Sequence, residues 1–155
     1  MATPELTSED LQTDFDSLNL PQNTYKDQIE TVIYSLEEND SAMVQATEDG
    51  YIWKFQYGTI EVFVQLTGET DEDLFTVWAK VLSLPAKNEL QLFRKLMELN
   101  WSGTFETCFS LFNDQIVVST QRTVDDLSPA EISRAITLVA TIADEYDEPL
   151  QAEYL

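Results

Sequence analysis

Two adjacent stretches in the first half of the chain alternate strictly between large apolar side chains and other types. Residues 51–57 place aromatic side chains at odd positions, and residues 60–66 place aliphatic side chains at even positions. An alternation of period two is typical of a β-strand with one buried face. A tight hairpin across Tyr57-Gly58 would bring both apolar sets to one side of a sheet. The sequence therefore predicts an antiparallel hairpin that pairs Phe55 with Ile60, Trp53 with Val62 and Tyr51 with Val64.

Three segments have the spacing of amphipathic helices. Apolar stripes predict helices over about 24–38 and 87–99, and the second has so wide an apolar arc that we expect it to be the more buried. A third helix begins at Ser128, where a cap hydroxyl is followed by a proline at the first helical position and a glutamate at the third. Its apolar stripe runs to Tyr146.

The remaining apolar segments indicate further strands. Residues 74–82 are apolar on both faces, which fits a doubly buried strand, although their composition also allows a helix. Residues 105–112 and 115–122 flank Asn113-Asp114, a favourable two-residue turn, and predict a second hairpin. This hairpin would place Leu111 opposite Ile116 and Phe109 opposite Val118.

The predicted order is α-β-β-β-α-β-β-α. Helices and hairpins in this order indicate an α+β fold, with a five-stranded antiparallel sheet and helices packed mainly on one face. Residues 21–146 would form a single domain between an acidic mobile N-terminal arm (1–20) and an acidic C-terminal tail (147–155). The arm spaces Leu11, Phe15 and Leu18 for one face of a short helix. It is therefore either a frayed terminus or a segment that docks on its own domain or on a partner chain.

The charge balance excludes several classes of function. The chain has 29 acidic and 8 basic residues, a formal net charge of −21 and no histidine. Such a surface repels nucleic-acid phosphates and anionic membranes, so we expect no nucleic-acid partner and no membrane partner. The missing imidazole excludes Ser-His-Asp and Cys-His catalysis. The single cysteine and the lack of a long apolar stretch favour a cytoplasmic location.

Two features of the sequence are candidates for chemical sites. Cys108 is the only thiol, and its neighbours offer no cation that would lower its pKa, so a structural, half-buried cysteine is expected. The acidic connection 69–73 could hold a hard cation, but it lacks the spacing and the glycine of a calcium loop, so a solvated loop is favoured. The sequence predicts no catalytic residue, no metal site and no cofactor.

Surplus apolar residues on the second face of the sheet form the candidate binding site. If the helices cover the face that carries Trp53 and Val62, several apolar side chains remain on the reverse face. A patch of this kind on a globular protein usually marks an interaction surface, although the arm or a helix could cover it instead. We call this set the sheet-face patch, and its members are Ile52, Phe63, Trp78, Phe112 and Val117. Trp78 belongs to it only if it points to the reverse face, which the pattern of its strand does not determine.

The same segments resemble the YbjN family and the type III secretion chaperone-like fold. The resemblance rests on the first hairpin at 51–66, the strand ending in Leu-Pro at 74–85, the helix at 90–100 that closes in Leu-Asn, and the capped helix at 127–143. The sequences of these segments are most similar to a cyanobacterial and plastid branch of unknown function. The resemblance implies a homodimer that binds other proteins without ATP, and it supplies no catalytic residues.

Two functions follow from these observations. The first is a non-enzymatic protein-binding module of chaperone-like or adaptor type, which holds a segment of a partner protein through the sheet-face patch. Its acidic coat would keep such a protein in solution while it displays apolar surface. The alternative is an acidic regulatory protein that presents its negative surface to a basic partner.

Overall fold

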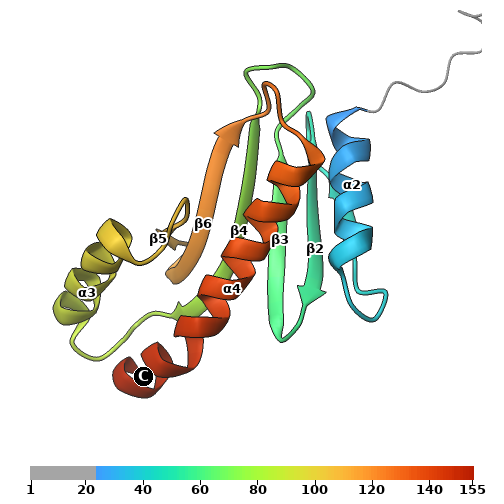
Figure 1. Cartoon of the computed structure of the whole chain (residues 1–155). Helices are drawn as coiled ribbons and strands as arrows, with labels where there is room; N and C mark the ends of the chain where they lie inside the picture. The colour runs from blue at the N-terminus through green and yellow to red at the C-terminus, as the bar shows by residue number, and fades with distance from the viewer. Residues whose placement is uncertain (1–23) are drawn as a thin grey trace, which may run out of the picture.

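The computed structural model describes residues 24–155, which form three helices and one six-stranded antiparallel sheet (Figure 1). The strands lie in the order β1-β2-β3-β4-β6-β5. Residues 1–20, which the sequence analysis assigns to an N-terminal arm, lie outside the described residues. The helices are α2 (Tyr25–Leu36), α3 (Glu89–Ser102) and α4 (Pro129–Tyr154), and the strands are β1 (Met43–Ala46), β2 (Tyr51–Tyr57), β3 (Ile60–Leu66), β4 (Leu74–Ser83), β5 (Cys108–Phe112) and β6 (Gln115–Thr123).

The predicted count of five strands is wrong, because β1 adds a sixth at the edge of the sheet. β1 pairs with β2, with Val44 opposite Trp53 and Ala46 opposite Tyr51. All four side chains of β1 are exposed. Alternation in a sequence reports the burial of one face. A four-residue edge strand without a buried side chain therefore leaves no such pattern.

The first hairpin forms as predicted, but its register differs by two residues. Tyr57 lies opposite Ile60 and Phe55 opposite Val62, so that Gly58-Thr59 make the turn. Gly58 adopts the left-handed region there, with φ of 62°, which glycine tolerates without steric cost. Because side chains alternate with a period of two, this shift leaves every side chain on its predicted face.

The second hairpin has its predicted register, with Leu111 opposite Ile116 and Phe109 opposite Val118. Asn113 and Asp114 both have positive φ, 50° and 57°. This is the combination that a tight two-residue turn needs to match the twist of its strands. The segment at 74–82 is a strand as predicted, and it forms most of β4.

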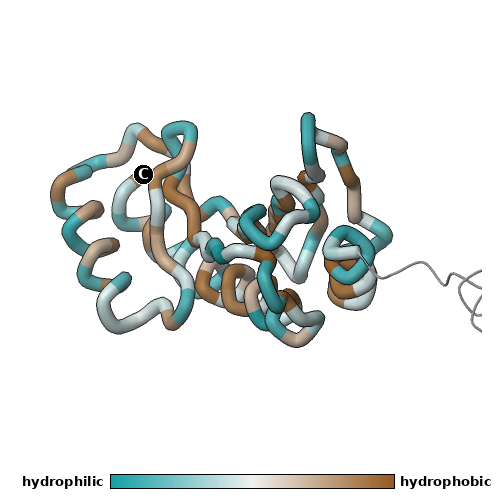
Figure 2. The backbone as a smooth tube through the Cα atoms, turned by 90° about the horizontal axis from the view of Figure 1, so that it is seen from above, coloured by the Kyte–Doolittle hydropathy of each residue, from teal (hydrophilic) through white to brown (hydrophobic). Residues whose placement is uncertain are grey.

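The core lies between the sheet and α4, which runs across β3, β4 and β6 (Figure 1). The sheet contributes its predicted apolar face, including Trp53, Phe55, Val62 and Val64, all at most 2 % exposed. α2 packs beside α4 and β2, and it adds Ile29 and Ile33 to the same core. Seen from above, α3 lies at the opposite end of the molecule from α2 (Figure 2).

Two predicted helix starts are confirmed by their capping bonds. The Thr24 hydroxyl accepts a hydrogen bond from the Asp27 amide at 3.1 Å. At the start of α4, the Glu131 amide donates to the Ser128 hydroxyl and the Ser128 amide donates to the Glu131 carboxylate, each at 3.2 Å. These reciprocal bonds satisfy amides that have no partner within the helix.

α4 continues beyond its predicted stripe, through the residues assigned to the acidic tail. Leu150 and Tyr154 are 1 % exposed, four positions apart, and they extend the buried face of the helix. The amide of Lys87 donates to the carbonyl of Tyr154 at 2.6 Å. The last turn of α4 is therefore held against the segment that leads into α3.

The prediction that α3 is more buried than α2 is wrong. Only Leu92 and Leu96 of α3 are buried. In the described part of the chain, α3 packs chiefly on β5 at the end of the sheet, and it meets the C-terminal end of α4, where Lys95 pairs with Glu153. The width of an apolar arc indicates burial only where other elements surround the helix, and here they do not.

Gly50, in the turn between β1 and β2, provides a test of how closely this turn packs against the end of β3. A Cβ atom at position 50 would lie 1.9 Å from the carbonyl oxygen of Leu66, which is backbone and cannot rotate away. Gly50→Ala should therefore lower the free energy of unfolding by about 2 kcal/mol in urea denaturation. Gly58→Asn is the control, because position 58 is open and asparagine tolerates positive φ. Equal stability of the two variants would contradict the close approach.

Candidate functional site

The face of the sheet that no helix of residues 24–155 covers carries a row of three aromatic rings from three strands. The rings of Phe63 and Trp78 stack with centroids 5.3 Å apart and planes 10° apart. Trp78 meets Phe112 edge to face, with centroids 5.9 Å apart. Such offset and edge contacts suit the quadrupoles of aromatic rings. β3, β4 and β5 thus contribute one continuous aromatic strip on the face opposite α4.

The structure brings together four of the five residues of the sheet-face patch. Phe112 is 49 % exposed, Phe63 and Trp78 are half-buried, and Val117 is only 2 % exposed. Val117 therefore forms the floor of the patch and offers little contact area of its own. Ile52 is half-buried on the same face, opposite Gln65 rather than beside the aromatic row.

A shallow hollow of about 310 Å³ opens beside Trp78 and Phe112. Polar side chains line much of the rest of its wall. The hydroxyls of Ser110 and Ser119 lie 3.0 Å apart, and the Gln121 amide donates to Thr76 at 3.0 Å. The hollow therefore combines an aromatic wall with neutral hydrogen-bonding groups.

The charge on this face differs from that of the whole chain. Lys54 and Lys80 flank Phe63 on its neighbouring strands, whereas Glu61 is the acidic residue among the strand positions of this face. Lys54 lies 3.9 Å from Glu61. Lys80 is exposed. A face with two lysines and one glutamate stands out in a chain of net charge −21.

Sequence reasoning missed a second apolar surface, on α3. Leu90, Met97 and Trp101 are 79 %, 70 % and 91 % exposed, and they recur at i, i+7 and i+11 on one side of the helix. We call these three residues the α3 outer face. Next to it, a groove of about 210 Å³ between α3 and β5 has almost entirely apolar walls, with Phe93, Met97 and Leu111 among its lining residues.

The signal for this surface was present in the sequence. Leu92 and Leu96 form one stripe of the helix, and the α3 outer face forms another. In the sequence the two stripes merge into one wide apolar arc, because periodicity alone does not tell which stripe meets a neighbour. Phe105, at the start of the next segment, is also 78 % exposed.

Asn100 fastens α3 to the outer edge of β5. Its side-chain amide donates to the carbonyl of Phe109 at 3.2 Å, and its side-chain oxygen accepts from the amide of Phe109 at 2.7 Å. The Phe109 ring meets Tyr146 of α4 edge to face, with centroids 5.5 Å apart. Asn100 thus makes the two bonds that a neighbouring strand would make at this position.

Cys108 is exposed, and the expectation of a half-buried cysteine is wrong. It begins β5 on the same face as Trp78. Its sulfur lies 3.5 Å from the Ser110 hydroxyl and 3.8 Å from that of Ser119. Because Cys108 is the first residue of β5, no preceding residue of that strand shields the thiol on that side.

The acidic connection 69–73 is hydrogen-bonded to the first residues of α2. The carboxylate of Glu69 accepts from the amides of Tyr25 and Lys26 at 3.0 and 3.1 Å, and so caps the N-terminus of α2. The Tyr25 hydroxyl donates to Asp71 at 3.2 Å. Desolvation, and then Asp71, raise the pKa of Tyr25. Within residues 24–155 no group of three or more acidic or cysteine side chains is arranged to hold a metal ion.

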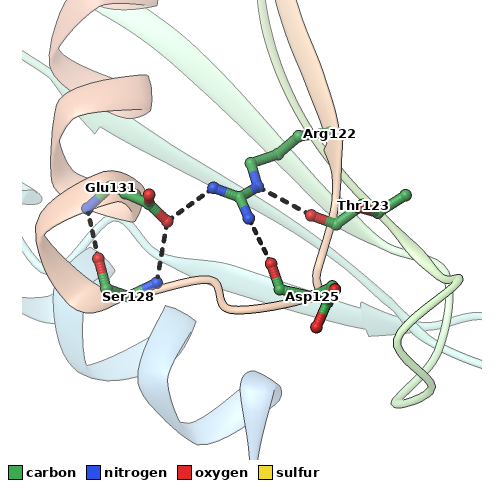
Figure 3. Close-up of polar contacts among 5 residues, drawn as sticks. All are labelled: Arg122, Thr123, Asp125, Ser128 and Glu131. Carbon is green, nitrogen blue, oxygen red and sulfur yellow. Dashed lines mark hydrogen bonds and ion pairs between the residues drawn. The ribbon is translucent and has the colours of Figure 1, made fainter.

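Arginines on β6 and α4 fix the position of α4. Figure 3 shows Arg122 of β6 reaching the carbonyls of Thr123 and Asp125 and the carboxylate of Glu131, which is 2.7 Å away. Arg134 makes a forked contact with Glu106, and this hydrogen bond lowers the pKa of the Glu106 carboxyl. Both guanidinium groups are already paired, so they are anchors for α4.

Asp73 gives a prediction for the pH dependence of stability. Its carboxylate accepts from the Thr70 amide and hydroxyl and from the Thr67 hydroxyl, at 2.7–2.9 Å. These bonds, those from Thr70 first, lower the pKa of Asp73 below its ordinary value of 3.8. A carboxyl whose pKa is lower in the folded state stabilises that state above its unfolded pKa, and this stabilisation is lost as the pH falls through the folded pKa.

Asp73→Asn should therefore be less stable than the wild type at neutral pH. Its deficit should shrink as the pH falls below 3.8. Urea denaturation at a series of pH values measures this difference. Glu72→Gln is the control, because Glu72 is exposed in the same connection. A deficit that stays constant down to acid pH would contradict the role of the Asp73 carboxylate.

One comparison places the chain among known proteins. Residues 26–152 match the model of the YbjN family, which is described as "Putative bacterial sensory transduction regulator". The match spans nearly all of the described fold, from α2 to the last turns of α4. No curated protein matches the chain. No helix among residues 24–155 is long and apolar enough to cross a membrane.

Proposed function

Because the chain belongs to the YbjN family, we propose that it is a non-enzymatic protein-binding module of chaperone-like or adaptor type that acts as a homodimer. The family description names a regulator, and a protein that acts by holding others fits that description. The finer placements, in the type III secretion chaperone-like fold, in a cyanobacterial and plastid branch and in the cytoplasm, belong to the same proposal and rest on the sequence.

The observation that carries the proposal is the exposure of the α3 outer face. Three large apolar side chains at 70–91 % exposure lie beside an apolar groove at one end of the domain. Leaving them in water costs the free energy of hydrating their surface, about 25 cal/mol per Å². Contact with a second copy would bury them, and one α3 could lie along the groove of the other.

The sheet-face patch then remains available for a partner protein. Its aromatic row, its hollow and its neutral hydrogen-bonding rim suit an extended segment with apolar side chains. Aromatic side chains at the centre of such a surface commonly supply most of the binding free energy. The two surfaces meet at β5, where Leu111 lines both the groove and the hollow.

Light scattering on the purified chain tests the dimer. We expect the wild type to have twice the chain mass of 17.7 kDa, and Trp101→Glu to have the mass of one chain, because a buried unpaired carboxylate opposes association. Tyr34→Glu is the control, since Tyr34 is 61 % exposed on α2, and it should remain dimeric. Circular dichroism checks that both variants fold. A wild-type monomer at micromolar concentration would overturn the homodimer.

Affinity capture from the native host tests partner binding. Proteins retained by the wild-type chain should be lost with Phe112→Asp, which places a charge on the aromatic row. They should be retained by Val44→Asp, on the other edge of the sheet, where the exposed fraction is 51 % against 49 % for Phe112. Identical protein sets from all three baits would contradict binding at the sheet-face patch.

The acidic alternative rests on one sequence observation: no basic residue follows Arg134, so the last 21 residues carry only negative charge. In that case the retained partners should be basic. Their release should follow salt concentration, because exposed charges are screened at about 10 Å in 0.1 M salt. Retention that is insensitive to salt and sensitive to Phe112→Asp favours the apolar patch.

A further inference from the structure

The chain outside the described structure ends at the rim of the sheet. Residues 1–23 precede α2, and the amides of Tyr25 and Lys26 are bonded to Glu69 in the connection between β3 and β4. That connection joins the ends of two central strands. A segment that starts there can follow either face of the sheet, and α4 already covers one of them.

The charges along the N-terminal segment suit a path over this rim. The rim is acidic, with Glu69, Asp71, Glu72 and Asp73 in one connection. The eight residues 17–24 carry no charge, so they can pass the rim without repulsion. All five acids of the segment lie further from α2, at Glu5, Glu9, Asp10, Asp14 and Asp16, and it contains no base.

The face of the sheet opposite α4 carries basic residues, which this segment lacks. Lys54 and Lys80 flank Phe63, away from the acidic rim, in a chain that has only eight basic residues. Lys80 is exposed. The aromatic row places its three rings 5.3 and 5.9 Å apart. In a helix, Leu11, Phe15 and Leu18 would stand about 6 and 4.5 Å apart along the axis, which matches the row.

The reach of the N-terminal segment can be compared with the distance to the aromatic row. Trp78 lies four residues into β4, or about 13 Å from the start of that strand at about 3.3 Å per residue. Residues 19–23, if extended, span about 16 Å. Residues 19–23 therefore span the distance along β4, and the passage around the rim from the face where α2 packs adds to the length of this path. Because the segment belongs to the same chain, its local concentration at the sheet is in the millimolar range. Docking therefore does not require two separate acidic molecules to approach each other.

We propose that residues 9–20 of the chain dock on its own sheet-face patch, with Leu11, Phe15 and Leu18 on the row Phe63–Trp78–Phe112 and the acids of the segment near Lys54 and Lys80. The inference goes beyond the proposed function, because docking of the segment needs no partner. Where a partner uses the same face, the segment competes with it and sets a threshold for binding.

Cys108 provides a probe for the test, because it is the only thiol of the chain and is exposed on the same face. The rate at which a bulky maleimide modifies it is measured in the full-length protein. In Leu11→Ser/Phe15→Ser/Leu18→Ser the rate should rise about tenfold, since a covered thiol reacts only from the undocked fraction. Leu6→Ser, outside the docking stretch, is the control and should leave the rate unchanged.

A second measurement follows Trp78 itself in a Trp101→Phe background. The triple variant should shift the tryptophan emission to longer wavelength, because Trp53 is buried and Trp78 becomes hydrated. A synthetic peptide of residues 1–20 added to the triple variant should reverse both effects. Lys54→Glu/Lys80→Glu should also raise the thiol rate, and Lys87→Glu, away from this face, should not.

Equal thiol rates and equal emission in the wild type and the triple variant would overturn the proposal. A thiol rate that falls with rising protein concentration in the triple variant would instead show that a second copy covers the face. Loss of the homodimer in light scattering leaves this test intact, since each measurement reads a single chain.

Discussion

The structure depends on the burial of one face of the sheet beneath α4. That face is apolar along its central strands, and α4 is the only element in the described part of the chain that crosses three of them. Both ends of α4 are fixed by polar contacts. Arg122 and the capping box hold the first turn, and the bond from the Lys87 amide holds the last. The apolar interior supplies the free energy, and the terminal bonds determine where the helix lies.

Local patterns in the sequence predicted most of this arrangement. Alternation found both hairpins, because one face of each is buried, and the turn at Asn113-Asp114 fixed the second register. The first register was two residues off, since a period of two does not distinguish neighbouring even shifts and the turn residues were misplaced. β1 escaped detection because a strand without a buried side chain has no alternation to detect.

The candidate site was predictable on the sheet and unpredictable on α3. The residues of the sheet-face patch alternate with buried residues along the same strands, so the pattern predicts the face of every member except Trp78. Only the folded structure places Trp78 beside Phe63 and shows that Val117 lies beneath the others. The burial of α3 depends on where the chain places it. Leu92 and Leu96 differ from Leu90 and Met97 in their neighbours, which belong to strands that follow the helix in the chain. No local pattern contains that information.

Asn100 has a consequence for the way the protein behaves at high concentration. An open sheet edge is a template on which further strands can add, and exposed aromatic side chains favour such growth where the edge is bare. By bonding both backbone groups of Phe109, Asn100 occupies the outer edge of β5 with a side chain that cannot propagate. At the other edge, β1 is only four residues long. Both edges of the described sheet therefore offer little room for a further strand, so the exposed aromatic side chains of its face are not accompanied by a long bare edge.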